Sequence, residues 1–428
     1  MGGLPIELFP LKFRPNMIGI KELRRLNPQA WTGLLAQDNA HDSILVTAVE
    51  REELNRGENA FRYVLSLDGY FEPITLIGKE TNVPEALFYG NIANNISDIA
   101  PHCWISHLEG DIGWVIHEEP YNNYLPEEWT GRDIERIIDR LVRLHGGTWD
   151  QEDELARIGF VHLLEGEMPE IGKKIPGVEA QALLQPLSLS KRIASWERGD
   201  LSLPSDHAIR VAGNLGLDLI QSAAALEKID QRGGWPGVFE DKHRQAAADL
   251  LDDPMPILYP LSLLPLSLIH GNTRPSAWHL DLLGNCQLSN WRSIKIGPSI
   301  YDLICLNLNM GLIKTKEGAN SLRKVWPITE ETIIDSYILA MGQQLGSKFS
   351  PILARQALPA VETLYILTAG IPRLANWIEE LELEGSNWQS DDRKDYEKFS
   401  NSGYSEFAAL RSYWSTIFTR FLSAYRSL

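Results

Sequence analysis

The sequence predicts an α+β protein in two parts, a smaller part rich in β-strands followed by a larger and mostly helical part. Up to about residue 120, runs of β-branched and aromatic residues alternate with turn residues, as in an antiparallel sheet. From residue 130 onward, apolar residues recur at helical spacing. The hydrophobic fraction of 44% is that of an ordinary globular chain with a sizeable core. We therefore divide the chain into 1–120 and 121–428.

Four strand-like runs stand out in the first part: 44–49, 61–67, 74–77 and 114–117. The third run continues to Lys79, and Glu85 begins an apolar-periodic stretch that predicts a helix. A lysine at a strand end is by itself more often simply solvated. Only six positions separate Lys79 from Glu85, which leaves open whether their charged side chains face each other or lie apart.

The second part begins with an amphipathic helix between Thr130 and Trp149. Its apolar residues recur at i, i+3, i+4 and i+7, and Thr130 with Asp133 forms a plausible cap. His145, near the end of this helix, is expected to pack against the core rather than to act in catalysis. Residues 151–265 are then predicted to form a mostly helical insertion.

One segment of the insertion, 177–218, resembles the helix-turn-helix of phage-repressor-type regulators, notably in the residues SWERG. Pro186 would interrupt its second helix at a cost of about 3 kcal/mol. The basic residues that could face DNA are few: Lys191, Arg192, Arg198 and Arg210. A DNA-binding regulator is therefore a minor alternative, and a helical insertion without that role is the main interpretation.

The most specific motif lies at 266–303, which reads LSLIHGNTRPSAWHLDLLGNCQLSNWRSIKIGPSIYDL. An apolar run leads into HGN, a hairpin-like segment follows, and SNW and GPSIYDL come after it. This order resembles the aminoglycoside phosphotransferase and choline kinase family, where HGDxHPxN is followed by IDW and GxPxYDL. The helix end LVRLHGGTWD also resembles that family. The resemblance implies a two-lobed protein-kinase-like fold and ATP-dependent phosphoryl transfer.

The same resemblance assigns roles to residues elsewhere. Lys79 and Glu85 match the strand lysine that neutralises nucleotide phosphates and the helix glutamate that holds it. The segment GWVIHEEP matches the hinge between lobes, where backbone groups read an adenine ring, and Glu118 lies in it. Lys79, Glu85 and Glu118 are thus candidate nucleotide-binding residues. Asp302, in YDL, is implied to brace the loops.

Three positions of the motif lack the charged or ligating residue of the family. Asn272 stands in place of the catalytic Asp, Ala277 in place of the metal-binding Asn, and Asn290 in place of the metal-binding Asp. An amide cannot take a proton, so general-base help worth about 10²–10⁴ in rate is expected to be missing. Ala277 supplies no ligand atom and Asn290 only a neutral oxygen, so we do not expect magnesium as a cofactor.

Basic residues lie beside these altered positions, namely Arg274, Arg292 and Lys295. They are candidates for binding an anion, such as ATP or another nucleotide, in place of the missing metal. The alternative is that they pair with nearby carboxylates on the surface. The sequence leaves these two interpretations open.

Charge and cysteine content narrow the possible partners. A net charge of −17 repels nucleic acid and anionic lipid unless a local basic patch exists, and no apolar run reaches membrane-spanning length. Three widely spaced cysteines and the absence of a signal-peptide pattern favour a cytoplasmic protein. We expect a small molecule, a nucleotide or a protein as partner, and neither a membrane nor nucleic acid.

Taken together, the motifs predict a catalytically degraded phosphotransferase, a pseudokinase that acts by binding a nucleotide, a small molecule or a protein partner. The main alternative is an active ATP-dependent phosphotransferase for a small molecule, with unconventional metal ligands.

Overall fold

The structure is a computed structural model, and it describes residues 19–36, 44–55, 59–96, 98–120, 126–164, 207–252, 254–310, 328–383 and 403–428. By its contacts, the chain divides into two compact units. The first contains the residues up to Phe160 together with His270–Lys295, and the second contains Val161–Ile269 and Ile296–Leu428. The first unit therefore extends beyond the predicted boundary at residue 120.

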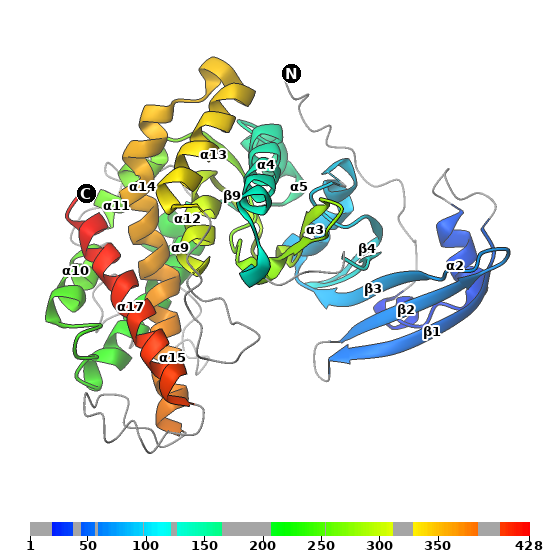
Figure 1. Ribbon diagram of the computed structural model, residues 1–428, viewed down its shortest axis with the longest axis horizontal. Helices are drawn as coiled ribbons and strands as arrows, with labels where there is room; N and C mark the ends of the chain where they lie inside the picture. Colours follow the sequence, from blue (N-terminus) through cyan, green and yellow to red (C-terminus); the bar gives the residue numbers. More distant parts are fainter. Residues whose placement is uncertain are drawn as a thin grey trace. The chain divides into compact units, whose positions relative to one another are not determined.

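A five-stranded antiparallel sheet organises the first unit (Figure 1). Its order is β1-β2-β3-β5-β4, with β1 at Val46–Asn55, β2 at Ala60–Leu67, β3 at Ile74–Thr81, β5 at Ile112–Glu118 and β4 at Cys103–Glu109. This confirms the predicted antiparallel sheet. The sequence pattern did not predict β4, because polar residues such as Ser106 and His107 interrupt its apolar run.

Large aromatic side chains fill the core on one side of this sheet. Trp31 of the helix α2 (Pro28–Leu35) is fully buried, and its ring centroid lies 5.3 Å from that of Tyr63 on β2. Trp114 of β5 belongs to the same cluster, and so does Leu23 of the short helix α1 (Ile20–Leu23). Burial of such rings is worth a few kcal/mol each, so this cluster stabilises the sheet.

The helix α3 (Val83–Asn91) follows β3 after a single residue, Asn82. The side chain of Asn82 caps it by accepting a hydrogen bond from the Glu85 backbone N–H at 3.2 Å. Proline at the second helical position fits such a start, because the missing N–H is not needed there. The helix packs against β4 and β5.

The predicted amphipathic helix is α4 (Gly131–Gly147). Asp133 accepts hydrogen bonds from the N–H and the hydroxyl of Thr130, both at 2.7 Å, which confirms the predicted cap. His145 is fully buried in this helix, as expected for a packing role. The helix α5 (Glu152–Ile158) and the antiparallel pair β7 (Trp278–Leu280) and β8 (Cys286–Leu288) complete the first unit.

The second unit is mainly helical, as predicted. Its strands are β6 (Leu266–Ile269) and its partner β9 (Lys295–Pro298), whose first residue belongs to the first unit. Its helices are α9 (His207–Gln231), α10 (Asp241–Asp252), α11 (Met255–Ser262), α12 (Ile300–Asn309), α13 (Glu330–Leu345), α14 (Pro351–Tyr365), α15 (Ile371–Leu383) and α17 (Gly403–Tyr425). A π-helical turn, Ile366–Gly370, joins α14 to α15.

Two predictions made for this unit can be compared with the structure. Trp414, Phe418 and Phe421 of α17 are buried, which confirms that this helix uses its aromatic stripe for core packing. Most of the helix-turn-helix-like segment, 177–206, lies outside the described residues, and 207–218 belong to the long helix α9.

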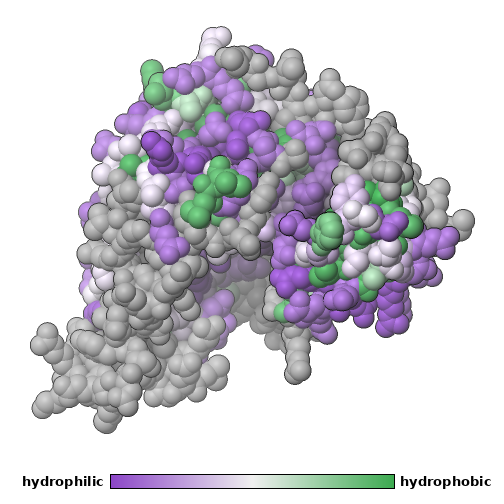
Figure 2. Space-filling model, turned by 45° about the vertical axis from the view of Figure 1, so that its right-hand side comes forward, coloured by the Kyte–Doolittle hydropathy of each residue, from purple (hydrophilic) through white to green (hydrophobic). Residues whose placement is uncertain are grey.

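Fourteen large apolar side chains of the described residues are exposed at the surface. Figure 2 shows mostly hydrophilic residues on the coloured part of the face drawn, with hydrophobic residues in small groups. Phe71, Leu282 and Leu283 are the most exposed of the large apolar side chains. None of the helices within the described ranges is long and apolar enough to cross a membrane.

Candidate functional site

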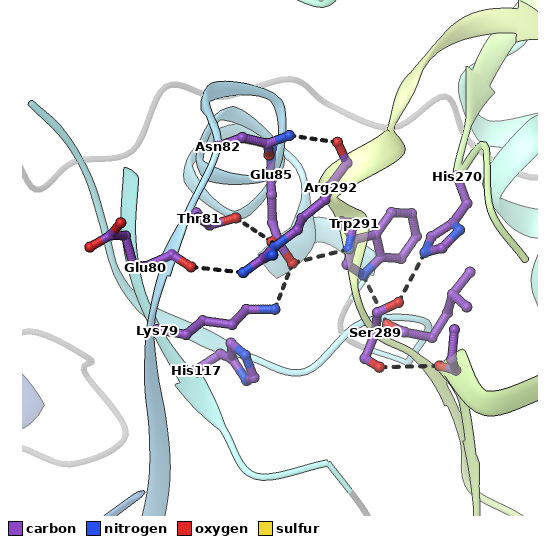
Figure 3. Close-up of polar contacts among 12 residues, drawn as sticks. Lys79, Glu80, Thr81, Asn82, Glu85, His117, His270, Ser289, Trp291 and Arg292 are labelled. Carbon is purple, nitrogen blue, oxygen red and sulfur yellow. Dashed lines mark hydrogen bonds and ion pairs between the residues drawn. The ribbon is translucent and has the colours of Figure 1, made fainter. Parts of the chain in front are cut away.

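An ion pair between Lys79 and Glu85 forms the centre of the candidate site (Figure 3). The Lys79 Nζ atom lies 2.7 Å from Glu85 Oε1. Because Asn82 alone connects β3 to α3, the first turn of the helix returns over the end of the strand and brings the two side chains together. Of the two arrangements that the sequence leaves open, the structure has the paired one.

Glu85 is completely buried, and two further hydrogen-bond donors and one further cation hold its carboxylate. The Thr81 hydroxyl donates to Oε2, the backbone N–H of Trp291 donates to Oε1 at 3.0 Å, and Arg292 Nε lies 3.7 Å from Oε2. Burial alone raises the pKa of Glu85, but Lys79 and the Thr81 hydroxyl outweigh it, so the pKa lies below its ordinary value. Glu85 is therefore a charged anchor.

Trp291, in the loop after β8, packs against the helix α3. Its ring stacks on Phe88, with centroids 3.9 Å apart and planes 19° from parallel, and its Nε1–H donates to the Leu288 carbonyl at 2.9 Å. Asn82 Nδ2 also donates to the Arg292 carbonyl at 2.8 Å. Sequence reasoning did not select Trp291, although its place in the SNW motif was a usable signal. The strand, the helix and the loop thus meet at one carboxylate.

His270 and Gly271 shape the loop that carries Asn272. His270 Nε2–H donates to the Ser289 carbonyl at 2.9 Å, and Nδ1 accepts from the Asn272 N–H at 3.3 Å. These two contacts define a neutral imidazole with its proton on Nε2. Gly271 has a φ of +78°, and a side chain there would collide with the Ser293 carbonyl. The HG pair is thus required by the loop geometry.

The three altered motif positions provide no charged ligand. Asn272 is half-buried, Ala277 is buried, and Asn290 is exposed in the left-handed region at φ 63° and ψ 58°. Within the described ranges, no three His, Cys, Asp or Glu side chains gather in a group that could hold a metal ion. A hard divalent cation prefers several anionic oxygens. These residues therefore do not fit a magnesium ion.

Of the basic residues beside the motif, Arg292 joins the ion-pair cluster. Its Nη2 atom donates to the Glu80 carbonyl at 3.1 Å, and 49% of its side chain is exposed, so part of the guanidinium still faces solvent. Arg274 is exposed and Lys295 is half-buried, and neither makes an ion pair with any described residue. Pairing with a carboxylate therefore accounts for Arg292 in part and for the other two not at all.

Glu118 lies apart from the Lys79–Glu85 pair, with its side chain exposed at the end of β5. Its backbone N–H donates to the His102 carbonyl at 2.9 Å, and the N–H of Glu119 donates to the Thr75 carbonyl at 3.3 Å. The next residue, Pro120, has no N–H. The described part of the predicted hinge therefore uses its N–H donors within the protein.

Two histidines that the sequence analysis did not select lie near Lys79. Burial and the charge of Lys79 lower the pKa of His117 to about 4, and the same two causes lower the pKa of His279. The His279 Nε2 atom lies 2.8 Å from the Ser289 hydroxyl oxygen. Figure 3 shows His117 beside Lys79. Both rings are therefore neutral at neutral pH, and the cation beside them is Lys79.

The buried His117 predicts a loss of stability in mild acid. An unfolded histidine binds its proton near a pH of about 6.5, whereas the folded His117 binds one only at a pH of about 4, so the unfolded state holds more protons between these values. From pH of about 6.5 to about 4.5, this term should lower the unfolding free energy by about 2–3 kcal/mol.

The measurement is denaturant unfolding of wild type, His117→Phe and His117→Gln at several pH values in that window. Both variants lack the titrating group, so their unfolding free energies should fall less steeply with acid than that of wild type. An identical slope in all three proteins would contradict the assignment.

No family model matches the chain, and no curated protein matches it in sequence. A choline kinase from Cryptosporidium parvum Iowa II is similar in structure, with 14% identity and a TM-score of 0.44, over 93% of this chain and 95% of that one.

Two further solved structures have similar values. A spectinomycin phosphotransferase in complex with ADP and spectinomycin has 10% identity and a TM-score of 0.42, over 94% of this chain and 100% of that one. An aminoglycoside phosphotransferase from Alicyclobacillus acidocaldarius has 11% identity and a TM-score of 0.40, over 89% of this chain and 92% of that one.

Proposed function

We propose that this protein is a catalytically degraded phosphotransferase that binds a phosphate-bearing small molecule, nucleotides included, without a metal ion. One observation carries the proposal. Lys79 and Glu85 form an ion pair, and the Trp291 N–H donates a hydrogen bond to the Glu85 carboxylate. The positions expected to carry the proton acceptor and the metal ligands are instead occupied by Asn272, Ala277 and Asn290. The ion pair that would bind phosphate is therefore present, whereas the residues that would catalyse phosphoryl transfer are absent from these three positions.

The charge balance supports an anionic ligand. A lysine ammonium has three N–H donors, and among the described residues Lys79 Nζ has one hydrogen-bond partner, Glu85, which leaves donors for a ligand oxygen. Arg292 adds a guanidinium that is half exposed. Arg274 and Lys295 lie in the same 266–303 motif of the sequence, and among the described residues neither forms an ion pair with a carboxylate. Such a set can bind phosphate oxygens directly through charge-assisted hydrogen bonds.

The proposal is tested by isothermal titration calorimetry with ATP and with tripolyphosphate, in EDTA and then in magnesium. Binding in EDTA is expected. Arg292→Gln should weaken it by about tenfold, because a hydrogen bond to a charged group is worth about 1.5–3 kcal/mol. Arg355→Gln is the matched control, since Arg355 is also half exposed and pairs with Asp335 at 2.7 Å in the second unit.

Three results would count against metal-free binding at this place. The first is that neither ligand binds, either in EDTA or in magnesium. The second is that binding requires magnesium. The third is that the Arg292 and Arg355 variants lose affinity equally. Magnesium-dependent ATP turnover that Lys79→Ala abolishes would instead favour the alternative function, an active phosphotransferase with unconventional metal ligands.

A further inference from the structure

We infer that His117 selects the ligand of this site, by accepting a hydrogen bond from a donor that the bound oxyanion itself carries. This inference rests on the proposed function, because it describes the same site. It predicts that oxyanions with a hydrogen of their own, either on a phosphate oxygen or on a hydroxyl group next to the phosphate, bind more tightly than anions that bind through charge alone. Anions without such a donor should be discriminated against.

The orientation of the His117 ring follows from its contacts. Its Nδ1 atom lies 2.7 Å from the Glu118 carbonyl oxygen, and a carbonyl can only accept, so Nδ1 carries the proton. The ring also stacks on Tyr89, with centroids 5.1 Å apart and planes 11° from parallel. The remaining nitrogen, Nε2, is then an acceptor with a fixed direction.

That acceptor has no partner. His117 is 3% exposed, and its Nε2 atom is buried without a hydrogen bond to any described residue. Buried polar side-chain atoms are seldom left unpaired, because their lost hydration is not replaced. An unpaired lone pair on a ring held by two independent contacts therefore indicates a partner other than the described residues, and we assign that role to the ligand.

The His117 ring lies beside the cation of the site. Lys79 acts on both His117 and His279, and Figure 3 shows His117 next to the Lys79 side chain. Lys79 can donate to the charged oxygens of an anion. A bare anionic oxygen that faced Nε2 would be repelled, whereas a P–OH or C–OH group would donate to it. An oxyanion that carries one hydrogen can therefore accept from the Lys79 ammonium and donate to His117 Nε2.

Inorganic phosphate and sulfate test this inference directly. In mildly alkaline buffer with EDTA, phosphate is a dianion that keeps one O–H, whereas sulfate is a dianion of the same shape without a hydrogen. Calorimetry should show that the wild-type protein prefers phosphate by at least about tenfold, since leaving a buried acceptor unpaired is costly. Methyl phosphate, a dianion without O–H, should bind like sulfate.

Glycerol 3-phosphate separates the two sources of the hydrogen. If it binds more tightly than methyl phosphate, a hydroxyl group next to the phosphate supplies the donor. If glycerol 3-phosphate binds only as tightly as methyl phosphate, and inorganic phosphate binds more tightly than both, a phosphate O–H group supplies the donor. Either result supports the acceptor role of His117.

Variants assign the selection to His117. His117→Phe keeps a flat ring for stacking on Tyr89 but has no acceptor, so the preference for phosphate should disappear. His117→Gln retains an amide oxygen and should keep part of it. His107→Phe changes a half-buried histidine on β4 of the same sheet and should leave the preference unchanged.

The outcomes separate this inference from the proposed function. If phosphate and sulfate bind wild type equally, the inference is wrong and the anion site stands. If neither anion nor tripolyphosphate binds, both fail. If the preference survives in His117→Phe, the hydrogen is recognised by another residue and the role of His117 is rejected.

Discussion

Replacing Lys79 by methionine is expected to lower the unfolding free energy of the sheet-bearing unit by about 3–5 kcal/mol. The reason is the burial of its partner. Glu85 is 0% exposed and Lys79 is 17% exposed, so the variant leaves a carboxylate in a low-dielectric interior without its nearest counter-ion. The Thr81 hydroxyl and the Trp291 N–H would still donate to it, but neither carries a charge, and the Arg292 guanidinium, 3.7 Å away, is half exposed.

Denaturant unfolding of Lys79→Met, Glu85→Gln and the double variant measures this effect. The double variant should be more stable than Lys79→Met alone, because the glutamine is neutral and can still accept from Trp291. Stability of Lys79→Met should also rise as the pH falls into the range where Glu85 takes up a proton. A loss below about 1 kcal/mol, the value typical of surface pairs, would show that the pair is not a buried anchor.

Restoring the three altered positions together is expected to create magnesium-dependent nucleotide binding. Asn272→Asp and Ala277→Asn add a carboxylate and an amide oxygen to the segment between β6 and β7, and Asn290→Asp adds a carboxylate to the loop that Trp291 holds against α3. The backbone at position 290 is left-handed, a conformation that Asp tolerates almost as well as Asn. General-base help of about 10²–10⁴ in rate would become available at position 272.

Calorimetry with ATP, with and without magnesium, and a coupled ADP-release assay measure the result. The matched control is the same triple variant with Lys79→Met added, which should lose the binding gained. A folded triple variant whose ATP affinity does not respond to magnesium would show that the site has lost more than its metal ligands.

Much of the fold could be predicted because its signals are local. Thr130 and Asp133 predict the capped start of the helix α4, and apolar runs predict the strands β2 and β3. The strand β4 could not be found in this way. The strand β4 is stabilised by pairing with β5 and by packing against α3. Both are tertiary contacts, and they do not require a continuous apolar pattern in the sequence of β4.

The candidate site was predictable in its identities and less so in its geometry. A motif resemblance was enough to select Lys79, Glu85, Asn272 and Asn290. It could not show that Glu85 is bound by Trp291, because these residues lie 206 positions apart. Nor could it select His117, whose orientation depends on where β5 lies between β3 and β4.

The shared carboxylate of Glu85 has a consequence for motion. Lys79 belongs to β3, Glu85 to α3 and Trp291 to the loop after β8, and each hydrogen bond to that carboxylate weakens if any one of the three segments moves away. Segments joined in this way open together rather than one by one. Their backbone amides should therefore exchange with solvent deuterium at a common rate, as one cooperative block within the first unit.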